Sequence, residues 1–100
     1  MAEHNLAGNM LEKRNFDGAI AHFERAVQLR FDNPESHYGM ADALRRKGDV
    51  ERAMTEARIS LNLRPNDPDT HVVLGMALMT KGSVDEAAEH FSKAVEIRPN

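Results

Sequence analysis

The sequence predicts an all-α fold, a right-handed solenoid of stacked helical hairpins with six antiparallel helices in three repeats. The first observation is a period of 34 residues, which separates Pro34 from Pro68 and Gly48 from Gly82. A fixed period of this length is typical of arrays in which one helical hairpin stacks on its copies. The second observation is a set of helix start and stop signals at the same interval, and the third is the helical spacing of the apolar residues.

We expect a single domain over residues 1–100, with repeats at 1–33, 34–67 and 68–100. Each repeat is predicted to contain one helix, a short turn and a second helix. Repeat arrays normally cover their last apolar face with a polar-backed helix, and the sequence shows none after Asn100. We therefore expect either a fragment of a longer array or an array that lacks its C-terminal capping helix.

In the first repeat, one helix is expected to end near Asn15, and a second helix carries an apolar stripe that includes Phe23. The second and third repeats begin at Asn33-Pro34 and Asp67-Pro68. At these points a capping side chain precedes a proline at the first helical position, where the missing N–H costs nothing.

Glycine is expected to end the first helix of the two later repeats, at Gly48 and Gly82, because it adopts the left-handed turn without strain. Leu-Arg-Pro and Ile-Arg-Pro sequences then stop the second helices. Ser83 and Glu86 have the spacing of a capping box at the start of the last helix.

Composition excludes several classes of function. The formal net charge is −3 with 29% charged residues, so the basic surface of a nucleic-acid-binding protein is absent and no nucleic-acid partner is expected. No apolar run is long enough to insert in a membrane, and the first residues are too polar for a signal peptide. Cysteine is absent, which excludes disulfides and thiolate metal sites and suits both reducing and oxidising compartments. The cytoplasm is the compartment that we expect.

At equivalent positions the repeats resemble the tetratricopeptide repeat, with its pattern aromatic-x2-Leu-Gly-x2-Tyr, Ala-x3-Phe and Pro. The third repeat carries the pattern most fully, and the others keep it in register. Its matching residues are His71, Leu74, Gly75, Leu78, Ala87, Phe91, Ala94 and Pro99. The resemblance implies the helical-hairpin fold and a protein-binding function, since the signature residues themselves serve packing.

Histidines occupy the usually aromatic position of each repeat, as His4, His37 and His71. Equivalent residues of stacked hairpins are separated by about 8–10 Å, too far apart to ligate one metal ion. We interpret them as packing residues and expect no metal site. No nucleophile elbow or glycine-rich phosphate loop occurs, so we expect no catalytic residue, no cofactor and no enzyme activity.

The resemblance also implies a partner-binding site, because in this family one stripe of each first helix faces a concave groove. That groove binds extended peptides or partner helices. Carried onto this sequence residue by residue, the groove comprises Asn5, Asn9, Glu12, Tyr38, Asp42, Arg45, Val72, Met76 and Met79. Methionine is flexible and polarizable, which suits adaptable binding surfaces. The competing interpretation is that the apolar stripe of the third repeat is another core seam.

One subgroup of the family binds the C-terminal carboxylate of heat-shock chaperones with a Lys/Asn/Asn/Lys/Arg set. Only Asn9 matches here, while Asn5, Gly39, Asp69 and Val73 stand at the other four positions. These replacements remove the positive charge that such a clamp needs, so we predict no binding of those acidic tails.

Two functions remain after these exclusions. The first is a non-catalytic scaffold that binds a peptide or partner helix in the groove. The second is a structural module that forms homo-oligomers through its last helix, where Phe91, Ala94 and Val95 lack a next neighbour.

Overall fold

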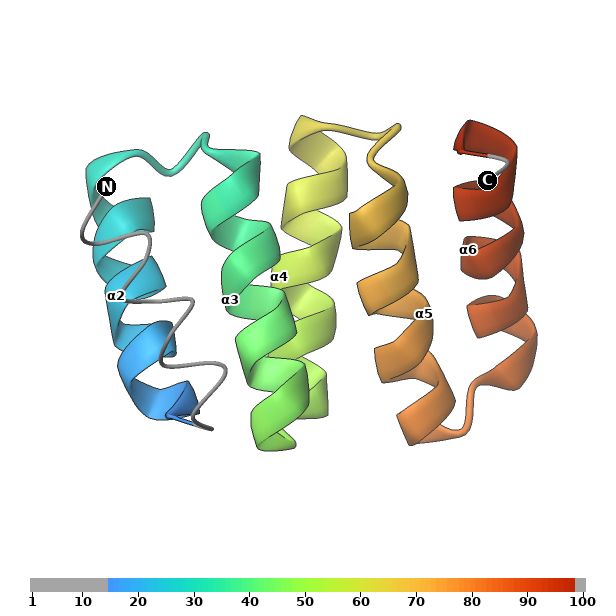
Figure 1. Cartoon of the computed structure of the whole chain (residues 1–100), viewed down its shortest axis with the longest axis horizontal. Coiled ribbons are helices and arrows are strands. Elements are labelled where there is room, and N and C mark those ends of the chain that lie inside the picture. The colour runs from blue at the N-terminus through green and yellow to red at the C-terminus, as the bar shows by residue number, and fades with distance from the viewer. Residues whose placement is uncertain (1–14, 99–100) are drawn as a thin grey trace.

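A computed structural model describes residues 15–98, which form helices and short turns only. The five helices are α2 (Phe16–Leu29), α3 (Pro34–Lys47), α4 (Val50–Leu63), α5 (Pro68–Lys81) and α6 (Val84–Ile97). They stand side by side in chain order, each running opposite to its neighbour (Figure 1). The predicted all-α repeat is thus present with five helices in this range, not six. The remaining predicted helix is the first along the chain, and it falls within residues 1–14, outside the described residues. The right-handed sense of the array stays a prediction.

The predicted proline starts are confirmed. Pro34 and Pro68 begin α3 and α5, and the preceding side chains cap these helices. Asn33 Oδ1 accepts a hydrogen bond from the backbone N–H of Glu35 at 3.0 Å. Asp67 likewise accepts from the N–H two residues along, at 3.1 Å. Each cap satisfies one of the backbone donors that a helix start leaves without a partner.

The predicted glycine stops are also confirmed, since Gly48 and Gly82 have φ of 102° and 95°. The capping box predicted at Ser83 and Glu86 is wrong, because Ser83 makes no side-chain cap bond. The Glu86 carboxylate instead accepts a hydrogen bond from Arg58 Nη2 of α4 at 3.1 Å. A charge-assisted bond from α4 to α6 thus replaces the local one.

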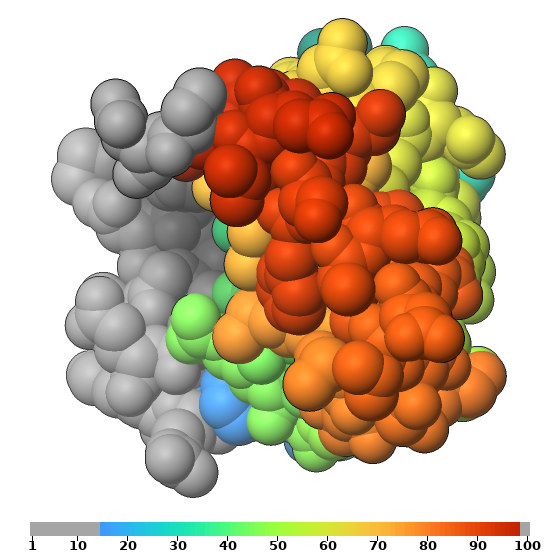
Figure 2. Space-filling view, turned by 90° about the vertical axis from the view of Figure 1, so that its right-hand side faces the viewer, coloured from blue at the N-terminus to red at the C-terminus, as the bar shows by residue number. Residues whose placement is uncertain are grey.

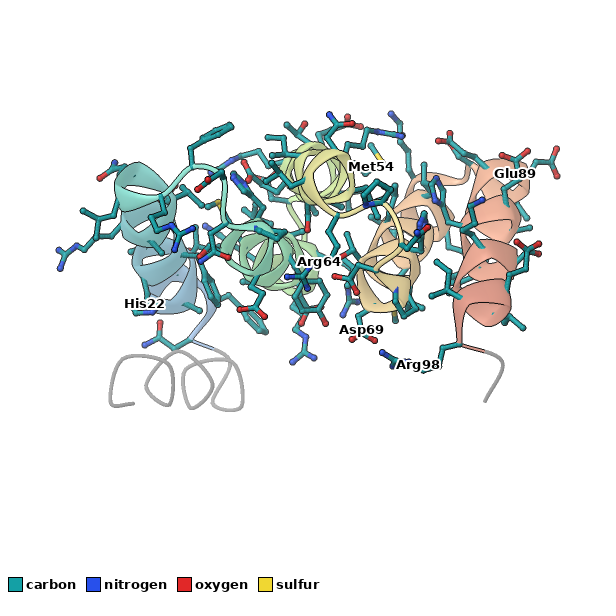
Figure 3. The ribbon with its side chains drawn as sticks, turned by 90° about the horizontal axis from the view of Figure 1, so that it is seen from above. His22, Met54, Arg64, Asp69, Glu89 and Arg98 are labelled. Carbon is teal, nitrogen blue, oxygen red and sulfur yellow. The ribbon has the colours of Figure 1, made fainter. Side chains whose placement is uncertain are left out.

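Each helix packs against the next along the chain, α2 against α3, α3 against α4, α4 against α5 and α5 against α6, and α3 also packs against α5. In the view from above, α3 and α5 lie in one layer and α4 lies behind them (Figure 3). The core divides into two clusters that follow this order. One joins α2, α3 and the start of α4, and the other joins α3, α4, α5 and α6.

Small residues allow the helices to approach closely. A methyl group on Gly75 would lie 2.8 Å from Cε1 of Phe91, so the ring occupies the space of an absent side chain. Gly39 of α3 has the same relation to the ring of Phe23 on α2. These two aromatic side chains are therefore seated over glycine, each between two helices.

None of the helices in residues 15–98 has the length and apolar character needed to cross a bilayer.

Candidate functional site

The six described residues of the predicted groove belong to the neighbouring helices α3 and α5. Tyr38, Asp42 and Arg45 lie on α3, and Val72, Met76 and Met79 lie on α5. We call the surface formed by these six residues the α3–α5 face. The other predicted groove residues, Asn5, Asn9 and Glu12, lie outside the described residues.

The α3 part of this face is an ion cluster around Asp42. Arg45 Nη2 donates to Asp42 Oδ1 at 2.9 Å, and Arg46 Nε lies 3.3 Å from Asp42 Oδ2. The Asp42 and Arg45 side chains are only 14% and 20% exposed, so water screens their interaction less than on an open surface. Arg45 Nε is buried and has no acceptor among the residues that the structure describes. The cluster holds two guanidinium groups beside one carboxylate and therefore presents net positive charge.

Tyr38 adds a neutral hydroxyl to the same part of the face. Burial raises the pKa of the Tyr38 phenol, and the carboxylates of Asp42, Asp69 and Asp67 raise it further. Because this pKa lies above its ordinary value of about 10, the phenol keeps its proton at neutral pH. Tyr38 can therefore donate a hydrogen bond to a partner's carbonyl or carboxylate oxygen.

The α5 part of the face is apolar and open. Met76 and Met79 are 40% and 49% exposed, although α5 buries its opposite side in the core. Exposed large apolar side chains that adjoin one another usually mark an interaction surface. The α3–α5 face thus combines an ion cluster, a phenol and an apolar methionine stripe on adjacent helices.

The residues predicted for self-association have different environments. Ala94 is buried, Phe91 is half-buried over Gly75, and Val95 is 60% exposed. Together with Pro68, Asp69, Val72 and Arg98 they line a hollow of about 240 Å³ between α5 and α6. At the end of the array α6 faces outward with no other described helix over it (Figure 2).

Sequence reasoning missed part of this outer surface of α6. Val84 is 54% exposed and lies on the same side of the helix as Ala88, Phe91 and Val95, at spacings of four, three and four residues. We call these four residues the α6 end face. Helical spacing places Val84 and Ala88 in the apolar stripe of this helix, but only Phe91, Ala94 and Val95 were assigned to self-association.

His37 and His71 are packing residues, as predicted, whereas His4 lies outside the described residues. His37 is 1% exposed and its ring nitrogens face two oxygens, Phe31 O at 2.6 Å and Glu56 Oε1 at 2.7 Å. His71 is also buried and donates through Nε2 to Pro65 O at 2.9 Å.

A histidine pair of the third repeat was not predicted from the sequence. The Nδ1 atoms of His71 and His90 lie 3.0 Å apart, so one ring donates a hydrogen bond to the other. His90 stands where Glu56 stands in the preceding repeat, and both lie 19 residues after the histidine that they contact. This interval of 19 residues, shared by the two repeats, is the sequence feature from which the histidine pair could have been predicted. Within residues 15–98 no cluster of three potential metal ligands occurs.

Comparison with known proteins places this geometry in a family. A family model described as anaphase-promoting complex, cyclosome, subunit 3 (ANAPC3) matches residues 12–94. No curated protein is significantly similar in sequence.

Solved structures share the fold. The first TPR domain of the human RPAP3 protein has a TM-score of 0.93 and 17% identity, over 98% of this chain and 77% of that chain. The Yersinia enterocolitica type III secretion translocator chaperone SycD, in a structure described as an alternative dimer, has a TM-score of 0.92 and 18% identity. That match covers 99% of this chain and 75% of that chain. MamA MSR-1 C2 has a TM-score of 0.83 and 25% identity over 95% of this chain, which spans 55% of the MamA chain.

Proposed function

Because the chain belongs to the tetratricopeptide-repeat-like family described as anaphase-promoting complex, cyclosome, subunit 3, we propose that it is a non-catalytic interaction module that binds a partner protein on the α3–α5 face. Tetratricopeptide domains are in general protein–protein interaction modules. The ligand is a peptide or a helix of the partner, lying across α3 and α5.

The observation that carries this proposal is the pairing of two chemistries on adjacent helices. Met76 and Met79 offer adaptable apolar contact, and each is at least 40% exposed. The cluster of Arg45, Arg46 and Asp42 offers donors in a fixed arrangement, which can bind a carboxylate or backbone carbonyl of the ligand. Apolar anchoring with a few fixed polar groups is how specific protein surfaces recognise their ligands.

The partner is not expected to be an acidic chaperone tail. Gly39 and Val73 stand where that clamp needs polar side chains, and both are buried, Gly39 against Phe23 and Val73 within the core. Asp69 stands where a lysine is needed and is itself paired with Arg98 at 3.3 Å. We expect a peptide that ends in such a tail to bind more weakly than about 100 μM by isothermal calorimetry, and tighter binding would contradict the assignment.

The test is a capture experiment with matched variants. The wild-type chain is compared with the triple substitution Tyr38→Ala, Asp42→Lys and Met76→Glu, and with Asn62→Lys on the exposed side of α4 as the control. Partner capture should be lost in the triple variant and kept in the control, with unchanged helical circular dichroism in both. Capture that survives the triple variant would refute binding on the α3–α5 face.

Self-association through α6 is the second candidate, and the exposure of Val84 and Val95 favours it. The charge of α6 counts against it: four carboxylates and one lysine give a formal charge of −3 with histidine neutral. Two α6 helices in contact would bring these like charges together. Sedimentation at about 100 μM separates the two candidates, since self-association requires a dimer that Val95→Glu dissociates.

A further inference from the structure

The α6 end face is a near-copy of a surface that another helix of the same chain already covers. Asp85, Phe91 and Val95 lie 68 residues, two repeat lengths, after Asp17, Phe23 and Val27 of α2. On α2 these positions contact α3, since Phe23 and Val27 adjoin the core cluster that α3 completes. On α6, Asp85 and Val95 are exposed, and Phe91 is half-buried over Gly75, with no other described helix over this side of α6 (Figure 2).

The sizes of facing residues at the existing helix interfaces indicate which residue can pack against the ring of Phe91. Phe23 of α2 is opposite Gly39 of α3, where a methyl group would overlap the ring. One repeat later, Ala57 replaces the phenylalanine and Val73 replaces the glycine, and both belong to one core cluster. The chain therefore pairs a large residue with a small one at both of these interfaces. The Phe91 ring is seated over Gly75 and only half-buried, so a helix that covers its exposed part needs glycine or alanine at the facing position.

Ion pairs between helices indicate which charge a helix packed on the α6 end face would carry in its last turn. The second residue of α2 and of α4 is acidic, and each pairs with the last lysine of the following helix. Asp17 Oδ1 lies 2.5 Å from Lys47 Nζ, and Glu51 Oε2 lies 3.0 Å from Lys81 Nζ. Asp85 is the third residue in this series, and it is exposed. A helix docked in the same way would place a basic residue of its last turn beside Asp85.

We propose that the α6 end face binds an amphipathic helix of a second protein that has the chemistry of α3. Such a helix carries a small residue opposite Phe91, an apolar stripe along Val84, Ala88 and Val95, and a lysine or arginine in its last turn beside Asp85. The hollow of about 240 Å³ beside Phe91 has room for one of its large apolar side chains. Glu89 and Glu96, which are exposed on α6, also favour a basic partner over a second copy of this chain. The α6 end face shares no residue with the α3–α5 face, although Val72 of that face also lines the hollow.

The probe is the chain's own α3 sequence, residues 33–48, as a synthetic peptide with blocked ends. A lactam bridge in place of the Asp42–Arg46 ion pair holds it helical, because so short a helix is marginal in water. The full chain, labelled with ¹⁵N, is titrated with this peptide and followed by NMR. The proposal expects shift changes centred on Val84, Asp85, Phe91 and Val95.

Matched variants test the register. Asp85→Lys should weaken binding about fivefold, and the peptide substitution Lys47→Glu should restore it. The peptide substitution Gly39→Val should weaken binding at least about tenfold, because valine collides with the Phe91 ring. The chain variant Asp17→Lys is the control and should bind the peptide like the wild type.

Four results would overturn the proposal. They are shift changes confined to the α3–α5 face, an effect of Asp17→Lys equal to that of Asp85→Lys, no shift changes at about 1 mM peptide, and a chain dimer that covers α6 and excludes the peptide. Asp85 is exposed, so its substitution leaves the fold intact and a change in peptide binding can be attributed to the lost charge.

Discussion

Exchanging the large and small residues of one helix interface should reveal that they are coupled. We consider Phe23 of α2 and Gly39 of α3, whose contact leaves no room for a methyl group on the glycine. The double substitution Phe23→Ala with Gly39→Val copies the pair Ala57 and Val73 that the chain has one repeat later. The structure therefore supplies both the contact to be broken and the arrangement that should repair it.

The magnitudes follow from burial and overlap. Phe23→Ala should lower the free energy of unfolding by about 2 kcal/mol, less than the 3–5 kcal/mol of a fully buried ring because this side chain is half-buried. Gly39→Val should cost about 1–2 kcal/mol, since overpacking outweighs the small gain in helix propensity. In the double variant the valine enters the space that the ring leaves. The total cost should then be about 1–2 kcal/mol below the sum of the single costs.

Urea unfolding followed by circular dichroism at 222 nm measures each free energy, provided that the slope against urea stays constant. The control combines Gly39→Val with Phe91→Ala, whose ring contacts Gly75 on another pair of helices, and these two costs should simply add. If the Phe23 and Gly39 costs also add to within about 0.5 kcal/mol, the argument from complementary sizes is refuted.

Three further predictions concern single residues. Burial first and then His71 lower the pKa of His90, so the unfolded chain binds this proton more readily. Stability should therefore fall as pH drops through about 6.5, the unfolded value, and His90→Gln should flatten the decline in urea midpoint between pH 7.5 and 5.5; an equal decline in both proteins would contradict this. Gly82→Ala should cost about 1 kcal/mol by thermal unfolding, because φ is 95° and no neighbouring atom is near; an unchanged melting temperature would contradict it. Glu56→Ala should cost about 1–3 kcal/mol by urea unfolding, because the buried Nδ1 of His37 loses its partner, and a neutral result would mean that another acceptor replaces the carboxylate.

The repeat period made most of the fold predictable. Proline and glycine act through local backbone geometry. The sequence therefore predicted directly that α3 and α5 begin at Pro34 and Pro68 and end at Gly48 and Gly82. The capping box at Ser83 failed for a tertiary reason. The Arg58 side chain comes from the preceding second helix and takes the carboxylate that the local motif required.

The sequence predicted which residues form the candidate site better than it predicted whether their side chains are exposed or buried. The exposure of Met76 and Met79 agrees with a surface role, which periodicity alone left open against a core seam. Ala94 was predicted to be available for association, yet it is buried, since a small side chain is easily covered by its neighbours. The histidine pair and the lysine pairs between helices depend on side-chain reach across an interface, which spacing along one helix does not reveal.

Packing between successive helices also determines which part of the molecule unfolds first. Among the described helices, α6 has its extensive contact with α5 alone, and the Arg58–Glu86 ion pair also joins it to α4. Detaching α6 therefore leaves the core of α2, α3 and α4 in place, and unfolding can begin at this end without disrupting the whole array. Contacts that are short along the chain also favour rapid folding. Amide hydrogen exchange should then be graded, with α6 exchanging before α3 and α4.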